Sequence, residues 1–301
     1  MINTNKAPRF GRVLIAMVTP FDAHGAVDEN EAARLARHLI KHGNDGLVVA
    51  GSTGESVTLS TEEKLRLFRV VKDAVGDSGA VLGGVGSSST ADTVKLIESA
   101  NDTGVDGFLV VTPAYNKPSQ EGMTQHFLAA ARATSLPIML YNVPGRTAVN
   151  LEPATVLRLA ETPNIVALKE AGVITQIGEV ARDAPDGFDI YCGADEFNLP
   201  ALALGAVGTI SVISHIVGDD LKNMHDAFFG GDMGAARRLH LKTIPITKAM
   251  FIAPNPVPTK TALAMLDVLS SSRVRLPLVD ASERERGIIH AALKDYGLLC
   301  G

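Results

Sequence analysis

Short apolar runs alternate with longer, more polar stretches over the first two thirds of the chain. Eight of these runs are rich in Val, Ile and Leu and almost continuous in hydrophobicity, which is typical of parallel strands buried on both faces. They are Val13–Val18, Leu47–Ala50, Ala80–Val85, Phe108–Val111, Ile138–Tyr141, Ile165–Lys169, Phe188–Cys192 and Thr209–Ile213. Successive runs begin 21 to 34 residues apart, which leaves room for a helix between each pair.

The stretches between the runs carry signals for the start of a helix. Asp28–Glu31 and Ser60–Glu63 fit a capping box, in which a side-chain oxygen and a carboxylate three residues later bind free backbone amides. Eight strand–helix repeats predict an α/β fold, a closed (β/α)8 barrel of the TIM type. The alternative is an open doubly wound sheet, which would more often carry a GxGxxG turn after its first strand. That turn is absent from this position.

The alternation stops near residue 225. Three later segments have a helical pattern: Ala235–Ala249, Thr259–Leu269 and Ser282–Tyr296. Pro245 predicts a kink or break in the first of them, because proline removes a backbone donor from the helix. We therefore predict a barrel over residues 1–231 and a C-terminal helical region over residues 232–301.

Composition excludes several classes of protein. With 46% hydrophobic and 20% charged residues among 301, the chain resembles an ordinary globular protein. A net charge of −5 and the absence of Trp argue against a nucleic-acid binder. Cys192 and Cys300 cannot form a disulfide framework, which favours a reducing, cytoplasmic location. Residues 1–12 lack the apolar segment of a secretory signal.

One uncharged stretch is long enough to cross a bilayer. Residues 197–218 contain no Asp, Glu, Lys or Arg. They do contain Pro200, Gly205, Gly208 and several hydroxyl side chains. This mixture favours a short buried helix, a turn and a buried strand, so no membrane association is expected.

Lys169 is the strongest candidate for chemistry. The active site of such a barrel lies at the carboxyl ends of its strands, and alternation places Lys169 on the same face as Ala167. If Ala167 points into the barrel, Lys169 lies in its mouth. Partial desolvation there favours the neutral amine, which can attack a ketone to form a Schiff base. The structural alternative is a rim lysine whose charged end reaches water.

Other strand ends carry further polar groups. Tyr115 and Tyr141 could relay protons, or could be rim aromatics without a chemical role. Ser52 and Thr53 lie in a glycine-flanked turn that could hold a carboxylate, or could be a tight turn without a ligand. Arg146 could bind a carboxylate with both nitrogens, or could be a solvated loop charge. Together these loops predict an enzyme that acts on small keto acids.

Four segments carry a resemblance to a known family. They are Gly51–Ser56, Tyr115–Gly122, Tyr141–Thr147 and Lys169–Ala171. They resemble the dihydrodipicolinate synthase (4-hydroxy-tetrahydrodipicolinate synthase) family of the pyruvate-dependent class I aldolases, a superfamily that includes N-acetylneuraminate lyase. The likeness covers nearly the whole chain, and Arg146 after Tyr-Asn-Val-Pro-Gly is its more specific mark of the synthases.

The resemblance implies that Lys169 condenses with pyruvate and that the resulting enamine attacks L-aspartate 4-semialdehyde, in lysine and diaminopimelate biosynthesis. Tyr141, Ser52 and Tyr115 match the proton relay of the family, with Tyr115 entering from a neighbouring subunit. Four residues match substrate-binding positions: Thr53, Arg146, Gly193 and Ile210. The resemblance also implies a homotetramer built from two dimers and, since the lysine supplies the electron sink, no metal or organic cofactor.

Some positions depart from the family pattern. Ser52 stands where threonine is common, and residues 192–195 read Cys-Gly-Ala-Asp instead of Ser-Gly-Asp-Asp. Ala114 replaces a tyrosine that lines the inhibitor pocket of lysine-inhibited members, and Lys64 matches a His or Glu of that pocket. Because the Lys64 cation would repel the ammonium groups of L-lysine, we expect weak inhibition by this amino acid.

Two other functions remain open. A sugar-acid aldolase or lyase, for N-acetylneuraminate or 2-keto-3-deoxygluconate, would need neutral hydroxyl partners where Arg146 offers a cation. A catalytically silent barrel that serves as a sensor or scaffold would leave Lys169 unmodified by borohydride and pyruvate.

Overall fold

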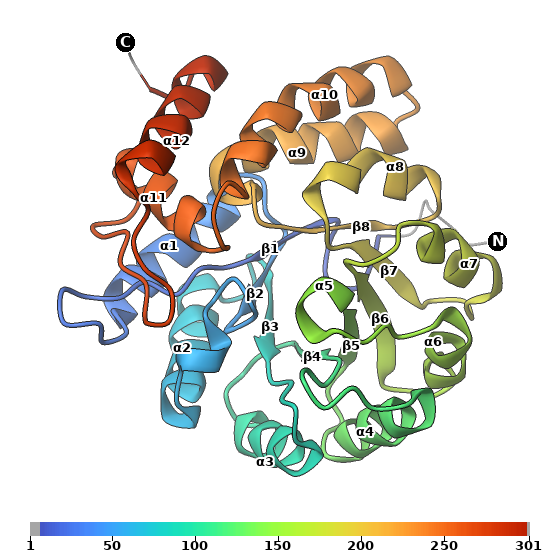
Figure 1. The fold of residues 1–301 in the computed structure, drawn as a ribbon. Coiled ribbons are helices and arrows are strands. Elements are labelled where there is room, and N and C mark those ends of the chain that lie inside the picture. Colours follow the sequence, from blue (N-terminus) through green and yellow to red (C-terminus); the bar gives the residue numbers. More distant parts are fainter. Residues whose placement is uncertain (1–6, 300–301) are drawn as a thin grey trace.

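Eight parallel strands close into a barrel in chain order (Figure 1). The structure, a computed structural model, describes residues 7–299, so Cys300 and residues 1–6 lie outside the described residues. The strands are β1 (Val13–Ala16), β2 (Gly46–Val49), β3 (Ala80–Gly84), β4 (Gly107–Val111), β5 (Ile138–Asn142), β6 (Ile165–Glu170), β7 (Asp189–Cys192) and β8 (Gly208–Ser211). The predicted (β/α)8 barrel is confirmed, and each strand begins and ends within two residues of its apolar run.

Helices surround the barrel, with at least one helix after each strand (Figure 1). They are α1 (Glu29–Lys41), α2 (Thr61–Val75), α3 (Thr90–Ala100), α4 (Gln120–Arg132), α5 (Pro144–Thr147), α6 (Pro153–Ala160), α7 (Thr175–Asp183), α8 (Asn198–Ala203) and α9 (Ser214–Phe229), with short 3-10 turns η1 (Ser56–Thr58) and η2 (Asp195–Phe197). Ser60 and Glu63 form the predicted capping box of α2. At α1 only half of the predicted box forms, because the Glu31 carboxylate binds Ser270 while Asp28 caps the helix.

The strands separate two hydrophobic clusters. The inner cluster fills the barrel and takes alternate residues from the strands, including Leu14, Val48, Met139 and Ala167. The outer cluster lies between the strands and the helices, and Leu168 belongs to it. Ala167 therefore points into the barrel, which meets the condition under which alternation places Lys169 at the mouth, and the inner cluster makes the barrel a packed core.

The C-terminal region adds three helices: α10 (Met233–Met250), α11 (Val257–Met265) and α12 (Glu283–Tyr296). Helix α10 packs against α8, α9 and α12, and α11 packs against α9 and α12. The break predicted at Pro245 is wrong, since α10 continues through this residue. Ile246, Ala249 and Met250 are buried and hold its last turns against their neighbours.

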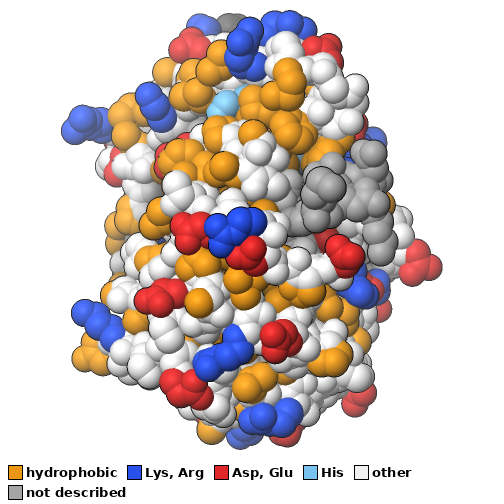
Figure 2. Space-filling view, turned by 90° about the vertical axis from the view of Figure 1, so that its right-hand side faces the viewer, with side chains coloured by type: hydrophobic (Ala, Val, Ile, Leu, Met, Phe, Trp, Pro, Cys, Tyr) orange, Lys and Arg blue, Asp and Glu red, His pale blue; other side chains and the backbone are white. Residues whose placement is uncertain are grey.

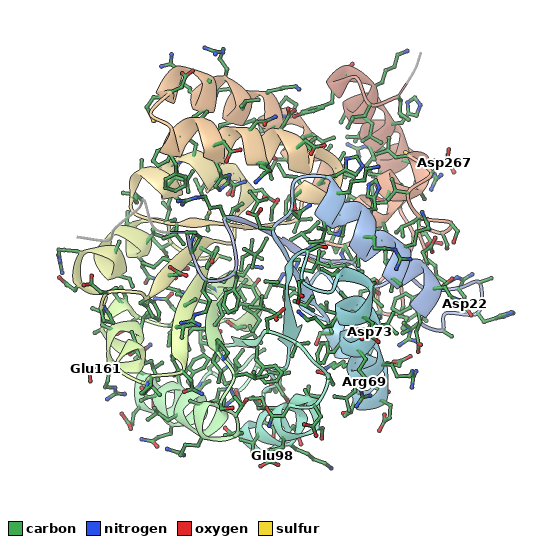
Figure 3. All side chains as sticks on the ribbon, turned by 180° about the vertical axis from the view of Figure 1, so that it is seen from behind. Asp22, Arg69, Asp73, Glu98, Glu161 and Asp267 are labelled. Atoms are coloured by element: carbon green, nitrogen blue, oxygen red, sulfur yellow. The ribbon has the colours of Figure 1, made fainter. Side chains whose placement is uncertain are left out.

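The surface carries interspersed charges. Figure 2 shows one face on which Lys, Arg, Asp and Glu side chains of both signs are scattered, while hydrophobic side chains gather in its upper half. Figure 3 shows charged side chains at the outer edge, among them Glu98 of α3 and Glu161 after α6. In the described part of the chain, no helix combines the length and the apolar character that a membrane span requires.

Candidate active site

Lys169 lies near the carboxyl end of β6, and only 4% of the residue is exposed. Its Nζ is 4.4 Å from the centroid of the Tyr141 ring. Within residues 7–299, no carboxylate forms an ion pair with this nitrogen, and no acceptor forms a hydrogen bond with it. The amine can therefore attack a carbonyl carbon without first breaking an ion pair.

Strand register brings Lys169 and Tyr141 together. The two residues are directly paired between β5 and β6, and Tyr141 is 5% exposed and belongs to the inner cluster. Parallel strands with this pairing project both side chains on the same side of the barrel wall. The phenol and the amine thus share one buried space at the barrel mouth.

Gly193 and Ile210 lie beside the same space. A β carbon at position 193 would lie 2.8 Å from Cε of Lys169 and 2.8 Å from Cβ of Ala171. The missing side chain at Gly193 therefore gives the room that Lys169 occupies. Ile210 of β8 is 1% exposed and belongs to the inner cluster with Tyr141.

Residues 51–56 form a close-packed turn after β2, which we call the Ser52–Thr53 turn. Thr53 is 3% exposed, and its Oγ1 accepts a hydrogen bond of 2.8 Å from Nδ2 of Asn255. Ser52 is half-buried. Because the Asn255 amide occupies an acceptor site of the Thr53 hydroxyl, the hydroxyl hydrogen can be donated to another group.

Arg146 and Tyr115 lie at the rim. Arg146 is on the short helix α5 and is exposed, and no ion pair or hydrogen bond among the described residues engages its guanidinium. Tyr115 is 93% exposed and has a φ of 75°. The structure therefore does not bring Tyr115 to Lys169 of the same chain, and its entry from a neighbouring subunit stays a prediction.

Comparisons with known proteins agree with this geometry. Residues 9–296 match the sequence profile of the Dihydrodipicolinate synthetase family. The chain belongs to this family. The 4-hydroxy-tetrahydrodipicolinate synthase of Moorella thermoacetica is 53% identical over 292 residues, which cover 97% of this chain and 100% of the relative. That of Desulforudis audaxviator is 50% identical and covers 96% of this chain and 99% of the relative.

Solved structures of the dihydrodipicolinate synthetase family share the fold. A dihydrodipicolinate synthase from Bacillus anthracis has a TM-score of 0.93 at 43% identity, covering 95% of this chain and 98% of that one. The enzyme from Cyanidioschyzon merolae, solved with lysine bound, has a TM-score of 0.94 at 42% identity, covering 96% and 99%. The family predicted from the sequence is confirmed, and the synthase is favoured over the sugar-acid enzyme and the silent barrel.

In this member of the dihydrodipicolinate synthetase family, Glu170 is a buried carboxylate that sequence reasoning assigned no role. It is 2% exposed, and its oxygens accept hydrogen bonds from Nδ2 of Asn142 at 2.9 and 3.1 Å and from the Gly172 amide at 2.6 Å. Gln176 donates a further bond of 3.3 Å. Burial raises the pKa of Glu170 to about 7, although these donors oppose the increase. Its place in Lys169-Glu170-Ala171 was the only sequence signal for it.

A second buried carboxylate, Asp195, closes the loop after β8. Its oxygens accept from the Ser211 hydroxyl at 2.5 Å and from the amides of Val212 and Ile213 at 2.8 and 3.1 Å. Burial raises the pKa of the neighbouring Cys192 thiol to about 12, which suits a small buried residue better than a nucleophile. In the described part of the chain, no group of three or more His, Cys, Asp or Glu side chains could hold a metal ion.

Proposed function

We propose that this chain condenses pyruvate with L-aspartate 4-semialdehyde to give 4-hydroxy-tetrahydrodipicolinate. Nζ of Lys169 attacks the ketone carbon of pyruvate, and the ketone oxygen leaves as water, which gives a protonated Schiff base. Loss of a proton from the methyl carbon gives an enamine. That carbon then forms a bond to the aldehyde carbon, whose oxygen takes up a proton. Finally, the amino nitrogen of the semialdehyde attacks the iminium carbon, which closes the ring and releases the Lys169 amine.

The observation that carries this proposal is the buried amine of Lys169, 4.4 Å from the Tyr141 ring centroid and without an anionic partner in residues 7–299. An ion pair would hold the ammonium and oppose the first step. Tyr141, Ser52 and Tyr115 are proposed to carry protons between the intermediates and solvent. The protonated Schiff base accepts the electrons of the methyl C–H bond, so the proposed reaction needs no metal or organic cofactor.

Two groups are proposed to receive the carboxylates. Pyruvate would lie against the Ser52–Thr53 turn, where the Thr53 hydroxyl can donate, and against the backbone of Gly193 and Ile210. The semialdehyde carboxylate would bind Arg146, since a planar guanidinium can bind both oxygens of a carboxylate. A sugar acid in this place would meet a cation where it needs neutral hydroxyl partners.

Borohydride reduction in the presence of pyruvate tests the covalent step. We expect a stable secondary amine on the peptide that contains Lys169, located by peptide mass mapping. Lys169→Arg is the matched control, since it keeps the charge and much of the size but cannot form the same imine at neutral pH. Pyruvate bound to another lysine, or no adduct at all, would refute the proposal.

A coupled assay then separates the two enzyme candidates. We expect turnover with pyruvate and L-aspartate 4-semialdehyde, and no cleavage of N-acetylneuraminate or 2-keto-3-deoxygluconate. Preferential cleavage of a sugar acid would replace the synthase with the alternative activity.

We also propose a cytoplasmic homotetramer in which dimers complete each other's sites. Tyr115 and Val57 are 93% and 96% exposed in the single chain, which suits a contact with a second copy. Mixing Tyr115→Ala and Lys169→Arg subunits tests the exchange, because each mixed dimer would contain one intact site. Random exchange should restore about a quarter of the wild-type activity, whereas no restoration would show that Tyr115 acts within its own chain or not at all. Sedimentation of the wild-type protein gives the oligomeric state.

A further inference from the structure

The C-terminal region reaches the active site through a set of buried and partly buried polar contacts. Asn255 donates to Thr53, as described above. Lys260 of α11 and Arg275 reach Glu55, which lies two residues after Thr53 in the Ser52–Thr53 turn. We call residues 255–275 the C-terminal strap. These contacts join positions more than 200 residues apart in the chain.

The Glu55–Lys260 contact is a fully buried ion pair. Its atoms Oε1 and Nζ are 2.6 Å apart, and the two side chains are 1% and 0% exposed. Nζ of Lys260 also donates to the Arg273 carbonyl at 2.7 Å and lies 4.1 Å from the ring centroid of Phe21. Burial lowers the pKa of Lys260 to about 8, so the lysine is charged at neutral pH beside its carboxylate partner.

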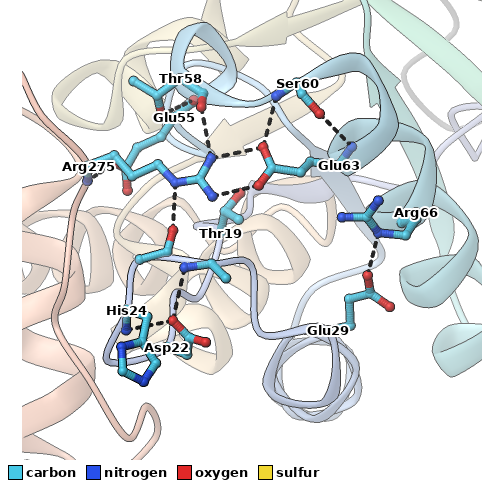
Figure 4. Close-up of polar contacts among 12 residues, drawn as sticks. Thr19, Asp22, His24, Glu29, Glu55, Thr58, Ser60, Glu63, Arg66 and Arg275 are labelled. Atoms are coloured by element: carbon cyan, nitrogen blue, oxygen red, sulfur yellow. Dashed lines mark hydrogen bonds and ion pairs between the residues drawn. The ribbon is translucent and has the colours of Figure 1, made fainter.

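Arg275 joins the other Glu55 oxygen to the start of α2. Its backbone amide donates to Oε2 of Glu55 at 2.9 Å. Its guanidinium binds both oxygens of Glu63, at 2.6 and 2.9 Å, and donates to the Thr58 carbonyl at 2.8 Å (Figure 4). The segment from residue 55 to residue 63 is therefore held at both ends and at its centre by the strap.

A buried ion pair is a poor device for stability alone. Removing two charges from water costs several kcal/mol, and well-packed apolar residues of the same volume often serve equally well. The backbone conformation of the residue that these contacts hold is more informative about their role. Glu55 has a φ of 55° and ψ of 36°, a left-handed conformation that disfavours side chains with a β carbon. The strap fixes the carboxylate of this residue, and thereby fixes the backbone on which Ser52 and Thr53 lie.

We propose that the C-terminal strap is a positioning element of the active site, in which Lys260 and Arg275 act through Glu55 to hold the Ser52–Thr53 turn for the pyruvate carboxylate. This inference rests on the function proposed above. Glu55, Lys260 and Arg275 are positioning residues, because they act through the turn. The strap and pyruvate should stabilise each other, since coupling between two sites is reciprocal.

Kinetics of strap variants test this inference. Glu55→Gln and Lys260→Met should raise the KM for pyruvate at least about tenfold, equivalent to about 1.4 kcal/mol of binding free energy. Borohydride at saturating pyruvate should still label Lys169 in both variants. The matched control is Arg66→Gln, at a position three residues after Glu63 in α2. This change breaks the exposed Arg66–Glu29 ion pair of 2.7 Å (Figure 4). It should leave the KM unchanged.

The double variant Glu55→Gln with Lys260→Met separates positioning from stability. Neither residue of this variant is charged, so its melting temperature should recover relative to the single variants. Its KM should stay high, because the contact that fixes the turn is still absent. A KM that recovers together with the melting temperature, or folded variants with wild-type KM, would overturn the inference.

Hydrogen exchange of the wild-type oligomer keeps the test independent of folding defects. Adding pyruvate should slow amide exchange in α11, and unchanged exchange there would also overturn the inference. If borohydride and pyruvate fail to label Lys169 of the wild-type protein, the proposed function fails first. If labelling succeeds and its dependence on pyruvate concentration is the same in every variant, only the role of the strap is lost.

Discussion

Glu170 makes the stability of this protein depend on pH in a direction opposite to that of most carboxylates. Burial raises its pKa from the ordinary 4.5 to about 7. Between these two values the folded protein binds more protons at this site than the unfolded chain does. The contribution of Glu170 to the free energy of unfolding therefore falls as the pH increases from 4.5 to 7. The loss is complete above the pKa of the folded protein.

The size of this effect follows from the difference between the two pKa values. At about 1.4 kcal/mol for each unit of pKa, the increase from 4.5 to about 7 corresponds to a loss of about 3 kcal/mol. The hydrogen bonds from Asn142 and Gly172 stabilise the ionised form of Glu170 and lower its pKa. They do not fully offset the loss of solvation, which raises it.

Glu170→Gln isolates the contribution of this carboxyl group. We would measure the free energy of unfolding in urea for both proteins between pH 4.5 and pH 8, at one fixed protein concentration. All other titrating groups are shared, so they cancel in the difference between the two curves. The stability of the variant relative to wild type should increase with pH by up to about 3 kcal/mol and then level above pH 7.

A flat difference curve would refute this reasoning, because it would show that Glu170 has the same pKa in both states. A difference that changes in the opposite direction would show that the donors, rather than desolvation, control the group. In that case Glu170 would be fully ionised in the folded protein at neutral pH.

Two substitutions and one added ligand should have distinct outcomes. Gly193→Ala should lower kcat/KM at least about 100-fold and the free energy of unfolding by roughly 1–3 kcal/mol, since its β carbon would lie 2.8 Å from Cε of Lys169; near-normal kinetics would contradict the packing argument. Arg146→Ala should raise the KM for L-aspartate 4-semialdehyde at least about tenfold, with unchanged borohydride labelling by pyruvate as the control. Sub-millimolar L-lysine should leave the steady-state activity nearly unchanged, because Lys64 carries a positive charge and Ala114 stands in place of a tyrosine. Strong inhibition would contradict this expectation.

The sequence predicts those features of the site that depend on local periodicity. Alternation within Ile165–Lys169 is sufficient to place Lys169 on the same face as Ala167, and the barrel places that face at its mouth. The Ser60 capping box is predicted for the same reason, because both of its partners lie within one turn. The prediction of a capping box for Asp28 and Glu31 is only half confirmed. Asp28 caps the helix, but the Glu31 carboxylate binds Ser270 instead of the Asp28 amide.

Contacts between residues that are far apart in the sequence could not be predicted from local periodicity. Glu55 and Lys260 are 205 residues apart, and neither has a local pattern that indicates a buried charge. The residues around Lys260 predict a helix, but they do not indicate that its charged group is buried or which residue it binds. The same limit applies to Tyr115, which is 93% exposed in one chain, so its entry into the site of a neighbouring subunit stays a prediction.

Glu170 and Asp195 join Glu55 as buried carboxylates near the site, and none of the three forms an ion pair with Lys169. Glu170 accepts from Asn142 of β5, from the Gly172 amide and from Gln176 of α7, and Asp195 accepts from the loop after β8, so both carboxylates bind neighbouring elements. Lys169 occupies the barrel face of the same strand as Glu170, with no carboxylate bound to it in residues 7–299. Both proposed substrates are carboxylates, and an anion on the inner face would repel them at close range. Strand alternation thus keeps an acid next to the reactive lysine in sequence while it directs the two groups to opposite sides of the barrel wall.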